Sequence, residues 1–193
     1  MGIKFSIVIP CYLLPDKDHE LLGFTADCIH SIEKYLDDYE LILIDNGSPV
    51  DSWFLQEEAD VYIRNKKNLG FAPAVNQGLK TARAEYITVC NNDIEFIHDW
   101  LSLAKDSFHT ETGVVCSHLH DHDPNHQVGR MPCNWGGMFG ALWMTTRNII
   151  DKVGYLDEEY KMGMWEDRDY WVGKKKKSIT TFITGDRDGH IHG

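Results

Sequence analysis

Residues 86–93 read Tyr-Ile-Thr-Val-Cys-Asn-Asn-Asp, a short β-branched, apolar run that ends in two asparagines and an aspartate. A run of this length and composition predicts a buried strand. The polar triplet Asn91-Asn92-Asp93 then begins where that strand ends. In open α/β sheets, ligands bind outside the carboxyl ends of parallel strands. This stretch therefore predicts both an element of the fold and a candidate site.

Earlier runs of the same kind alternate with helical patterns. The expected strands are residues 5–9, 41–44 and 61–63, and the expected helices are about 21–36 and 72–82. Strand and helix in alternation, with short connections, predict a mainly parallel sheet covered by helices on both faces, an α/β fold. Polar residues also follow the first two of these strands, at Cys11-Tyr12 and at Asp45-Asn46-Gly47-Ser48. The three polar groups are expected to share one edge of the sheet.

The second half of the chain is less regular. Residues 117–135 have no convincing periodicity and residues 136–144 are glycine-rich and apolar. Helical patterns return near 146–153 and 165–173, and residues 179–183 are expected to form a last strand. No repeat, low-complexity segment or linker divides the 193 residues, so we expect one domain over residues 1–193.

Composition excludes several classes of protein. The net charge of −11 disfavours a nucleic-acid binder, which needs a basic face, and an anionic substrate would have to be held locally by a metal or by backbone amides. The five cysteines form no CxxC pair, which fits reduced thiols in a cytoplasmic protein. The apolar run near the start, residues 7–9, is too short for a signal peptide or a transmembrane segment. The basic run 174–177 is interpreted as a solvated loop, with peripheral contact with an anionic membrane surface as the alternative.

Two aspartates at strand ends have two interpretations each. Asp93 has the position of a carboxylate that holds a hard divalent cation, which would bridge to diphosphate oxygens; it would equally suit a turn that caps the next helix. Asp45 could accept a hydrogen bond from the ring N–H of a uracil or thymine base, or it could form an Asx turn with Gly47.

The segment Glu166-Asp167-Arg168-Asp169 is a dense acidic cluster at the start of a helical pattern. These carboxylates could be helix caps stabilised by the dipole, or one could be a general base beside an acceptor hydroxyl. His190 and His192 lie at the end of the sequence. The histidine-rich run 118–126 resembles a metal site in composition, but the lack of periodicity there favours a loop.

Taken together, the pattern resembles glycosyltransferase family 2, whose members have the GT-A fold. The matching segments follow the family's order over nearly the whole chain: residues 5–12, 43–48, 68–72, 76–78, 84–93, 153–158 and 166–169. The resemblance implies a Rossmann-like, mainly parallel sheet flanked by helices. It also implies a nucleotide-binding half over residues 1–97 and an acceptor-binding half over 98–193.

For the donor, the resemblance implies contacts from several of these segments. Pro10 and Tyr12 would line the nucleoside pocket, and Asp45 would pair with a pyrimidine base. Asn91 would lie near the ribose, as part of an asparagine-rich form of the family's DXD element. The other donor contacts would come from Asn92, Asn76 and Gly137, the last beside Gly136.

For the chemistry, the resemblance implies Asp93 as the metal ligand, completed by His190 or His192. Asp167 would be the catalytic base, and Glu166 would help to orient the acceptor. The cation would be Mn²⁺ or Mg²⁺, and a histidine ligand favours Mn²⁺.

The implied function is an inverting, metal-dependent glycosyltransferase. The donor would be a nucleotide-diphosphate sugar, with UDP- or dTDP-sugars favoured, and the acceptor a glycan, lipid-linked or protein hydroxyl. A non-catalytic nucleotide-sugar or glycan-binding module of the same fold is the alternative. The sequence lacks the glycine-rich basic loop of a nucleotide-sugar pyrophosphorylase and the GxGxxG of a dinucleotide dehydrogenase.

Overall fold

The computed structural model describes residues 3–15, 20–108, 112–117, 141–159 and 180–184. Within them the first half alternates strand and helix as predicted: β1 (Phe5–Cys11), α1 (Glu20–Tyr35), β2 (Tyr39–Asp45), α2 (Trp53–Glu58), β3 (Val61–Arg64), α3 (Phe71–Thr81) and β4 (Tyr86–Cys90). The second half contributes α4 (Trp100–Asp106), β5 (Thr112–Ser117), β6 (Leu142–Thr146), α5 (Arg147–Val153) and β7 (Thr180–Thr184).

The strands form one sheet in the order β3-β2-β1-β4-β6-β5-β7. β1 pairs in parallel with both β2 and β4, and β2 pairs in parallel with β3. Only β6, among the described strands, runs against its neighbours, β4 and β5. The prediction of a mainly parallel α/β sheet is therefore confirmed.

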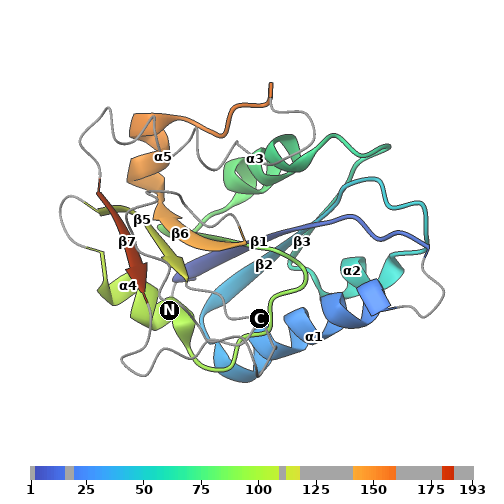
Figure 1. Cartoon of the computed structure of the whole chain (residues 1–193), viewed down its shortest axis with the longest axis horizontal. Coiled ribbons are helices and arrows are strands. Elements are labelled where there is room, and N and C mark those ends of the chain that lie inside the picture. Colours follow the sequence, from blue (N-terminus) through green and yellow to red (C-terminus); the bar gives the residue numbers. More distant parts are fainter. Residues whose placement is uncertain (1–2, 16–19, 109–111, 118–140, 160–179, 185–193) are drawn as a thin grey trace, which may run out of the picture.

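Helices cover both faces of the sheet (Figure 1). One hydrophobic core joins alternate residues of β1, such as Ile7 and Ile9, to α1, α2 and α4. The other contains Val8, which points to the opposite face, with α3 and α5. This follows from the two-residue period of a strand, whose successive side chains face opposite sides.

A glycine allows α3 to pack closely on the sheet. A Cβ atom on Gly78 would lie 2.2 Å from Cγ1 of Val8 and 3.1 Å from Cδ1 of Ile44. No larger residue fits this helix position unless those core side chains move.

Some elements differ from the sequence prediction. β6 lies partly in the glycine-rich stretch 136–144, where no strand was expected, and α2, α4 and β5 were also not predicted. The predicted helical stretch at 146–153 is α5, and the last predicted strand, 179–183, is β7 at Thr180–Thr184. The helical pattern at 165–173 lies outside the described residues.

Candidate functional site

The polar residues after β1, β2 and β4 meet at one edge of the sheet. Cys11, the last residue of β1, is in register with Asp45, the last residue of β2. On the other side of β1, Val8 pairs with Val89, so the end of β4 lies beside the end of β1. The chain order of the strands reverses between β1 and β4. Such a reversal is where open α/β sheets form their ligand crevice.

The Asn-Asn-Asp element continues directly from β4 and is held from two sides. The backbone N–H of Asn91 donates to the carbonyl of Ala141, 2.7 Å away, just before β6. The side-chain amide of Asn92 donates to the Thr25 hydroxyl of α1 at 2.8 Å. Asp93 is exposed, and its carboxylate accepts no hydrogen bond from the described part of the chain. It is therefore open to an external partner.

Asp45 is in the opposite state, with no exposed surface. Its Oδ1 accepts the backbone N–H of Ser48 at 2.8 Å. Its Oδ2 accepts the Tyr62 hydroxyl at 3.2 Å and the Ser52 hydroxyl, and it pairs with Arg64 at 2.8 Å. Burial by itself raises the pKa of Asp45, but the hydrogen bonds from Ser52 and Ser48 and the charge of Arg64 bring it below its usual value.

The sequence offered an Asx turn with Gly47 as one interpretation of Asp45; in the structure the carboxylate accepts the N–H one residue further on, that of Ser48. Gly47 lies inside this turn with φ +82°, and a Cβ there would come within 2.4 Å of the Lys67 backbone. The other interpretation, a contact with a base, would need one of the partners of Asp45 to give way.

Asn46 was not singled out in the sequence, yet it organises the neighbouring loop. Its side-chain amide donates to the Asn68 side chain and to the Gly70 carbonyl, each at 3.0 Å. Its oxygen accepts from the Asn65 side chain at 3.0 Å and from the Leu69 N–H at 3.1 Å. The signal that could have revealed it is the Asn-Gly pair after a strand, with two further asparagines, Asn65 and Asn68, after the next strand.

The predicted nucleoside residues differ in accessibility. Tyr12 is 38% exposed and Pro10 is partly buried, so the Tyr12 ring can be reached from solvent at the end of β1. Asn76 is 1% exposed. Its amide accepts the Leu156 N–H at 3.0 Å and donates to the Leu156 carbonyl and to Glu158, each at 2.9 Å. In this structure the hydrogen bonds of Asn76 connect α3 to the segment that follows α5.

The remaining predicted site residues, Gly137, Glu166, Asp167, His190 and His192, lie outside the described residues, as do Gly136 and the histidine-rich run 118–126. Within the described ranges, no group of three or more His, Cys, Asp or Glu side chains is arranged to hold a metal ion. Asp93 is thus the metal-ligand candidate that the described residues supply at this edge. The chemistry of one exposed carboxylate suits a hard cation that takes its other ligands from substrate phosphates.

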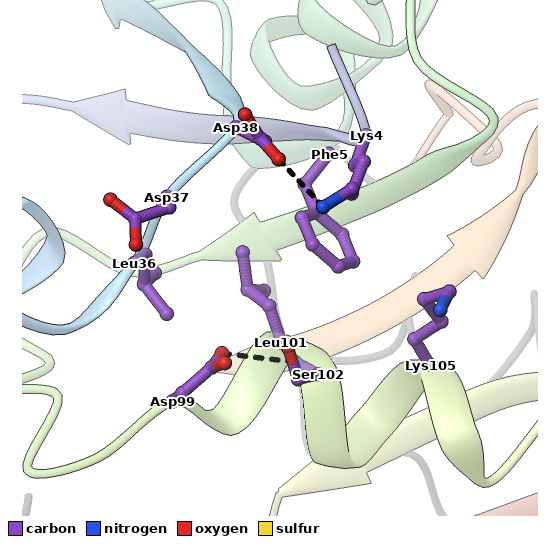
Figure 2. A pocket seen from close by; sticks show the side chains of 9 residues that line it. All are labelled: Lys4, Phe5, Leu36, Asp37, Asp38, Asp99, Leu101, Ser102 and Lys105. Atoms are coloured by element: carbon purple, nitrogen blue, oxygen red, sulfur yellow. Dashed lines mark hydrogen bonds and ion pairs between the residues drawn. The ribbon is translucent and has the colours of Figure 1, made fainter. Parts of the chain in front are cut away.

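A pocket of about 300 Å³ lies at the opposite end of the sheet (Figure 2). It is lined by Lys4 and Phe5 at the start of β1, by residues 36–38 before β2, and by α4. Lys4 pairs with Asp38 at 2.6 Å across its edge. Because it lies at the amino ends of β1 and β2, this pocket is separate from the crevice at their carboxyl ends. Across the described ranges no helix is both long enough and apolar enough to cross a membrane.

Comparison with known proteins gives a family match and a structural match. The model of the family described as "Glycosyl transferase family 2" matches residues 6–157. An uncharacterized glycosyltransferase of Rickettsia bellii is 29% identical over 120 residues, and glycosyltransferase GlyG of Streptococcus pneumoniae is 28% identical over 100 residues. These alignments cover 60% and 48% of this chain but only 16% and 31% of the relatives, so the chain spans less than a third of either.

Two solved structures share the fold at 14% sequence identity. The mannosyltransferase PcManGT of Pyrobaculum calidifontis, in complex with GDP-Man and Mn²⁺, matches with a TM-score of 0.73 over 96% of this chain and 56% of its own. TarS of S. aureus, residues 1–349 in complex with UDP, matches with a TM-score of 0.76 over 98% of this chain and 60% of its own.

Proposed function

The chain belongs to glycosyl transferase family 2 and has the GT-A fold, and from this premise we propose that it transfers a sugar from a nucleotide-diphosphate donor to an acceptor hydroxyl. The observation that carries the proposal is Asp93, an exposed carboxylate at the β1/β4 reversal whose oxygens accept no hydrogen bond from the described residues. Among the described residues, no helix cap or ion pair uses this carboxylate. Asp93 has instead the exposure that a ligand residue needs.

In this proposal, Asp93 would hold a divalent cation, Mn²⁺ or Mg²⁺, together with His190 or His192. The cation would neutralise the charge of the departing nucleoside diphosphate. Neighbouring residues would bind the donor: Tyr12 offers an exposed ring to the nucleoside, and Asn91 and Asn92, which follow β4, would contribute further contacts.

Asp167 accepts the proton of the acceptor hydroxyl as that oxygen attacks the anomeric carbon from the face opposite the leaving group. The attack forms the new glycosidic bond and breaks the bond to the diphosphate, so the anomeric configuration inverts. Glu166 orients the acceptor, and Gly137 lies by the donor sugar and diphosphate. Holding both substrates in one crevice supplies a large part of the rate enhancement.

The base of the donor is proposed to be a pyrimidine, with Asp45 as its partner. Asp45 is buried and its carboxylate is already bonded to Ser52 and Arg64. Contact with the base therefore requires one of these two bonds to break when the nucleotide binds. The two structural neighbours contain UDP in one case and GDP-Man in the other, so the fold accommodates both kinds of base.

We further propose one catalytic domain over residues 1–193, with a nucleotide-binding half (1–97) and an acceptor-binding half (98–193). Strands from both halves lie in one sheet, which supports a single unit. A cytoplasmic location is supported by Cys11, Cys28, Cys90 and Cys116, which are all buried free thiols.

The test is a thermal-shift panel of UDP-, dTDP- and GDP-sugars with and without Mn²⁺. A ligand that binds the folded state raises the melting temperature. We expect a UDP- or dTDP-sugar to raise it only when Mn²⁺ is present, and the same sugar to be transferred or slowly hydrolysed on incubation. Binding without any turnover would favour the non-catalytic sugar-binding module.

A further inference from the structure

A polar stripe on α1 contacts the chain segment that carries Asp93. The stripe consists of Thr25, Cys28 and Ser31, which follow one another at intervals of three residues and therefore lie on one face of the helix. Their exposures are 0%, 1% and 5%. Helix faces buried against a sheet are normally apolar, and a buried polar group is costly unless it is hydrogen-bonded. These three side chains therefore need hydrogen-bond partners.

Each of them has a partner in the segment that follows β4. The Thr25 hydroxyl accepts the Asn92 side-chain amide at 2.8 Å. The Cys28 thiol donates to the Asn91 carbonyl at 3.6 Å. The Ser31 hydroxyl accepts the Phe96 N–H at 2.9 Å. The stripe thus holds this segment on both sides of Asp93, which itself is exposed.

Cys90, the last residue of β4, makes a further contact with the same segment. Its thiol donates to the Asn91 carbonyl at 3.1 Å, so two thiols share one acceptor oxygen. Burial raises the pKa of the Cys90 thiol well above its usual value, which keeps the proton that this bond needs. From the other side, Ala141 accepts the Asn91 N–H.

We propose that Thr25, Cys28 and Ser31 are positioning residues that fix the backbone of residues 91–96 and thereby hold Asp93 in the orientation that binds the metal–diphosphate complex. The inference rests on the proposed function, since it assigns these residues a role through Asp93. None of the three is hydrogen-bonded to the Asp93 carboxylate, so each would act on the cation indirectly, through the segment that carries Asp93. A loop that is pinned beforehand loses less freedom when the ligand binds.

The experiment measures Mn²⁺ affinity by calorimetry in the presence of UDP, with a parallel series in GDP. Thr25→Val keeps the shape of the side chain and removes its hydroxyl, and Ser31→Ala removes the second anchor. Each is expected to weaken Mn²⁺ binding by about 10-fold, the lower end of the range for groups that orient a metal ligand, because both act indirectly. Thr25→Ser, which restores a hydroxyl, is expected to recover most of the affinity.

Thr81→Val is the matched control. The Thr81 hydroxyl also makes a hydrogen bond on a helix, to the Gln77 carbonyl at 2.8 Å, but it lies at the end of α3 away from the segment. It is expected to leave Mn²⁺ affinity unchanged. A double-mutant cycle of Thr25→Val with Asn92→Ala should be non-additive, because the two side chains act through one contact.

The outcomes separate the inference from the function. If Asp93→Ala abolishes Mn²⁺ binding while Thr25→Val and Ser31→Ala bind as the wild type does, the positioning role is wrong and the proposed function stands. If the wild type binds Mn²⁺ with neither UDP nor GDP, the proposed function fails and the inference fails with it. Equal weakening in Thr81→Val would show a general loss of stability and would also overturn the positioning role.

Discussion

Asp45, the last residue of β2, and Asp93, which follows β4, lie at the same end of the sheet, but their surroundings give them different properties. Asp45 is fully buried and has four polar partners, two in the loop after β2 and two on β3. Asp93 is exposed beyond β4. A carboxylate whose charge is already neutralised holds the fold together, whereas an open one can bind a cation. This contrast supports Asp93 as the metal ligand.

Asp167→Asn is predicted to reduce sugar transfer by about 10²–10⁴-fold, the usual contribution of a positioned general base. The substitution keeps the shape of the side chain and removes its basicity, so donor binding should survive. Turnover and calorimetric donor affinity, measured on the same preparation, check both halves of the prediction. A variant with near wild-type turnover would move the role to Glu166 or Asp169.

The sequence located the ends of the strands but not the state of the residues there. Asp45 and Asp93 each follow an apolar run, which sufficed to place both at the sheet edge. Tyr62 and Arg64 reach Asp45 only once β3 lies beside β2, so this part of its environment could not be seen from the sequence. The same holds for Asn76, whose partner Leu156 is 80 residues away.

At the scale of the elements, a long or strongly apolar pattern was enough for prediction and a short one was not always. The strands β1, β2 and β4 are buried on both faces and appear in the sequence as continuous apolar runs, whereas β3 is partly exposed and was predicted from a short run of three residues. α2 and α4 have six and seven residues, so each offers at most about two turns of helical pattern, and α4 was missed although α5, of the same length, was predicted. β6 begins inside the glycine-rich stretch 136–144, whose composition does not predict a strand.

Gly78→Ala is predicted to lower the free energy of unfolding by about 1–3 kcal/mol, because its Cβ would collide with Val8 in a packed core. Gly23→Ala is the matched control: it lies on α1 with no atom within 4 Å of the added Cβ. There alanine should be neutral or stabilising by up to about 1 kcal/mol, through its helix propensity. Urea unfolding of both variants measures the difference, and equal stability would contradict the packing of α3 on β1.

The Glu40 carboxylate links three elements and makes stability depend on pH. It lies on β2, is 1% exposed, and accepts bonds from Ser6 of β1 and from Arg83 after α3. Burial tends to raise the pKa of Glu40, but these bonds bring it below the ordinary 4.5. A lowered pKa stabilises the fold above the unfolded value and loses that contribution as the pH falls through the folded value.

Wild-type stability should therefore fall as the pH is lowered below about 4.5, and Glu40→Gln should reduce the slope of this fall. Denaturant unfolding at several pH values between 7 and 3 gives both slopes. Identical slopes would show that Glu40 contributes nothing to the acid sensitivity.

At the scale of the whole molecule, the charge balance has to be reconciled with the proposed donor. The chain carries a net charge of −11, which repels a nucleotide diphosphate at a distance. Binding must then come from a local positive group. The described part of the chain offers Asp93 for a cation and no cluster of three ligands, so in the proposed site the other ligands would be substrate oxygens, with His190 or His192.

His190→Ala, His192→Ala and the double variant are predicted to differ in Mn²⁺ affinity measured with a saturating nucleoside diphosphate. If one histidine completes the metal shell, replacing that histidine alone should weaken Mn²⁺ binding. The double variant should then bind Mn²⁺ as weakly as that single variant. His30→Ala, on the exposed side of α1, provides a control that removes a histidine elsewhere. Wild-type Mn²⁺ affinity in all three variants would show that neither His190 nor His192 is part of the site.

The most direct test of the whole account is a calorimetric titration of Mn²⁺ in the presence of UDP for wild type, Asp93→Ala and Glu95→Gln. Glu95 is an exposed carboxylate two residues from Asp93, so its removal changes the local charge without touching the proposed ligand. We predict that the wild type and Glu95→Gln bind Mn²⁺ alike, and that Asp93→Ala shows no UDP-dependent binding. Unchanged Mn²⁺ affinity in Asp93→Ala would contradict the central claim that this carboxylate anchors the metal and the donor.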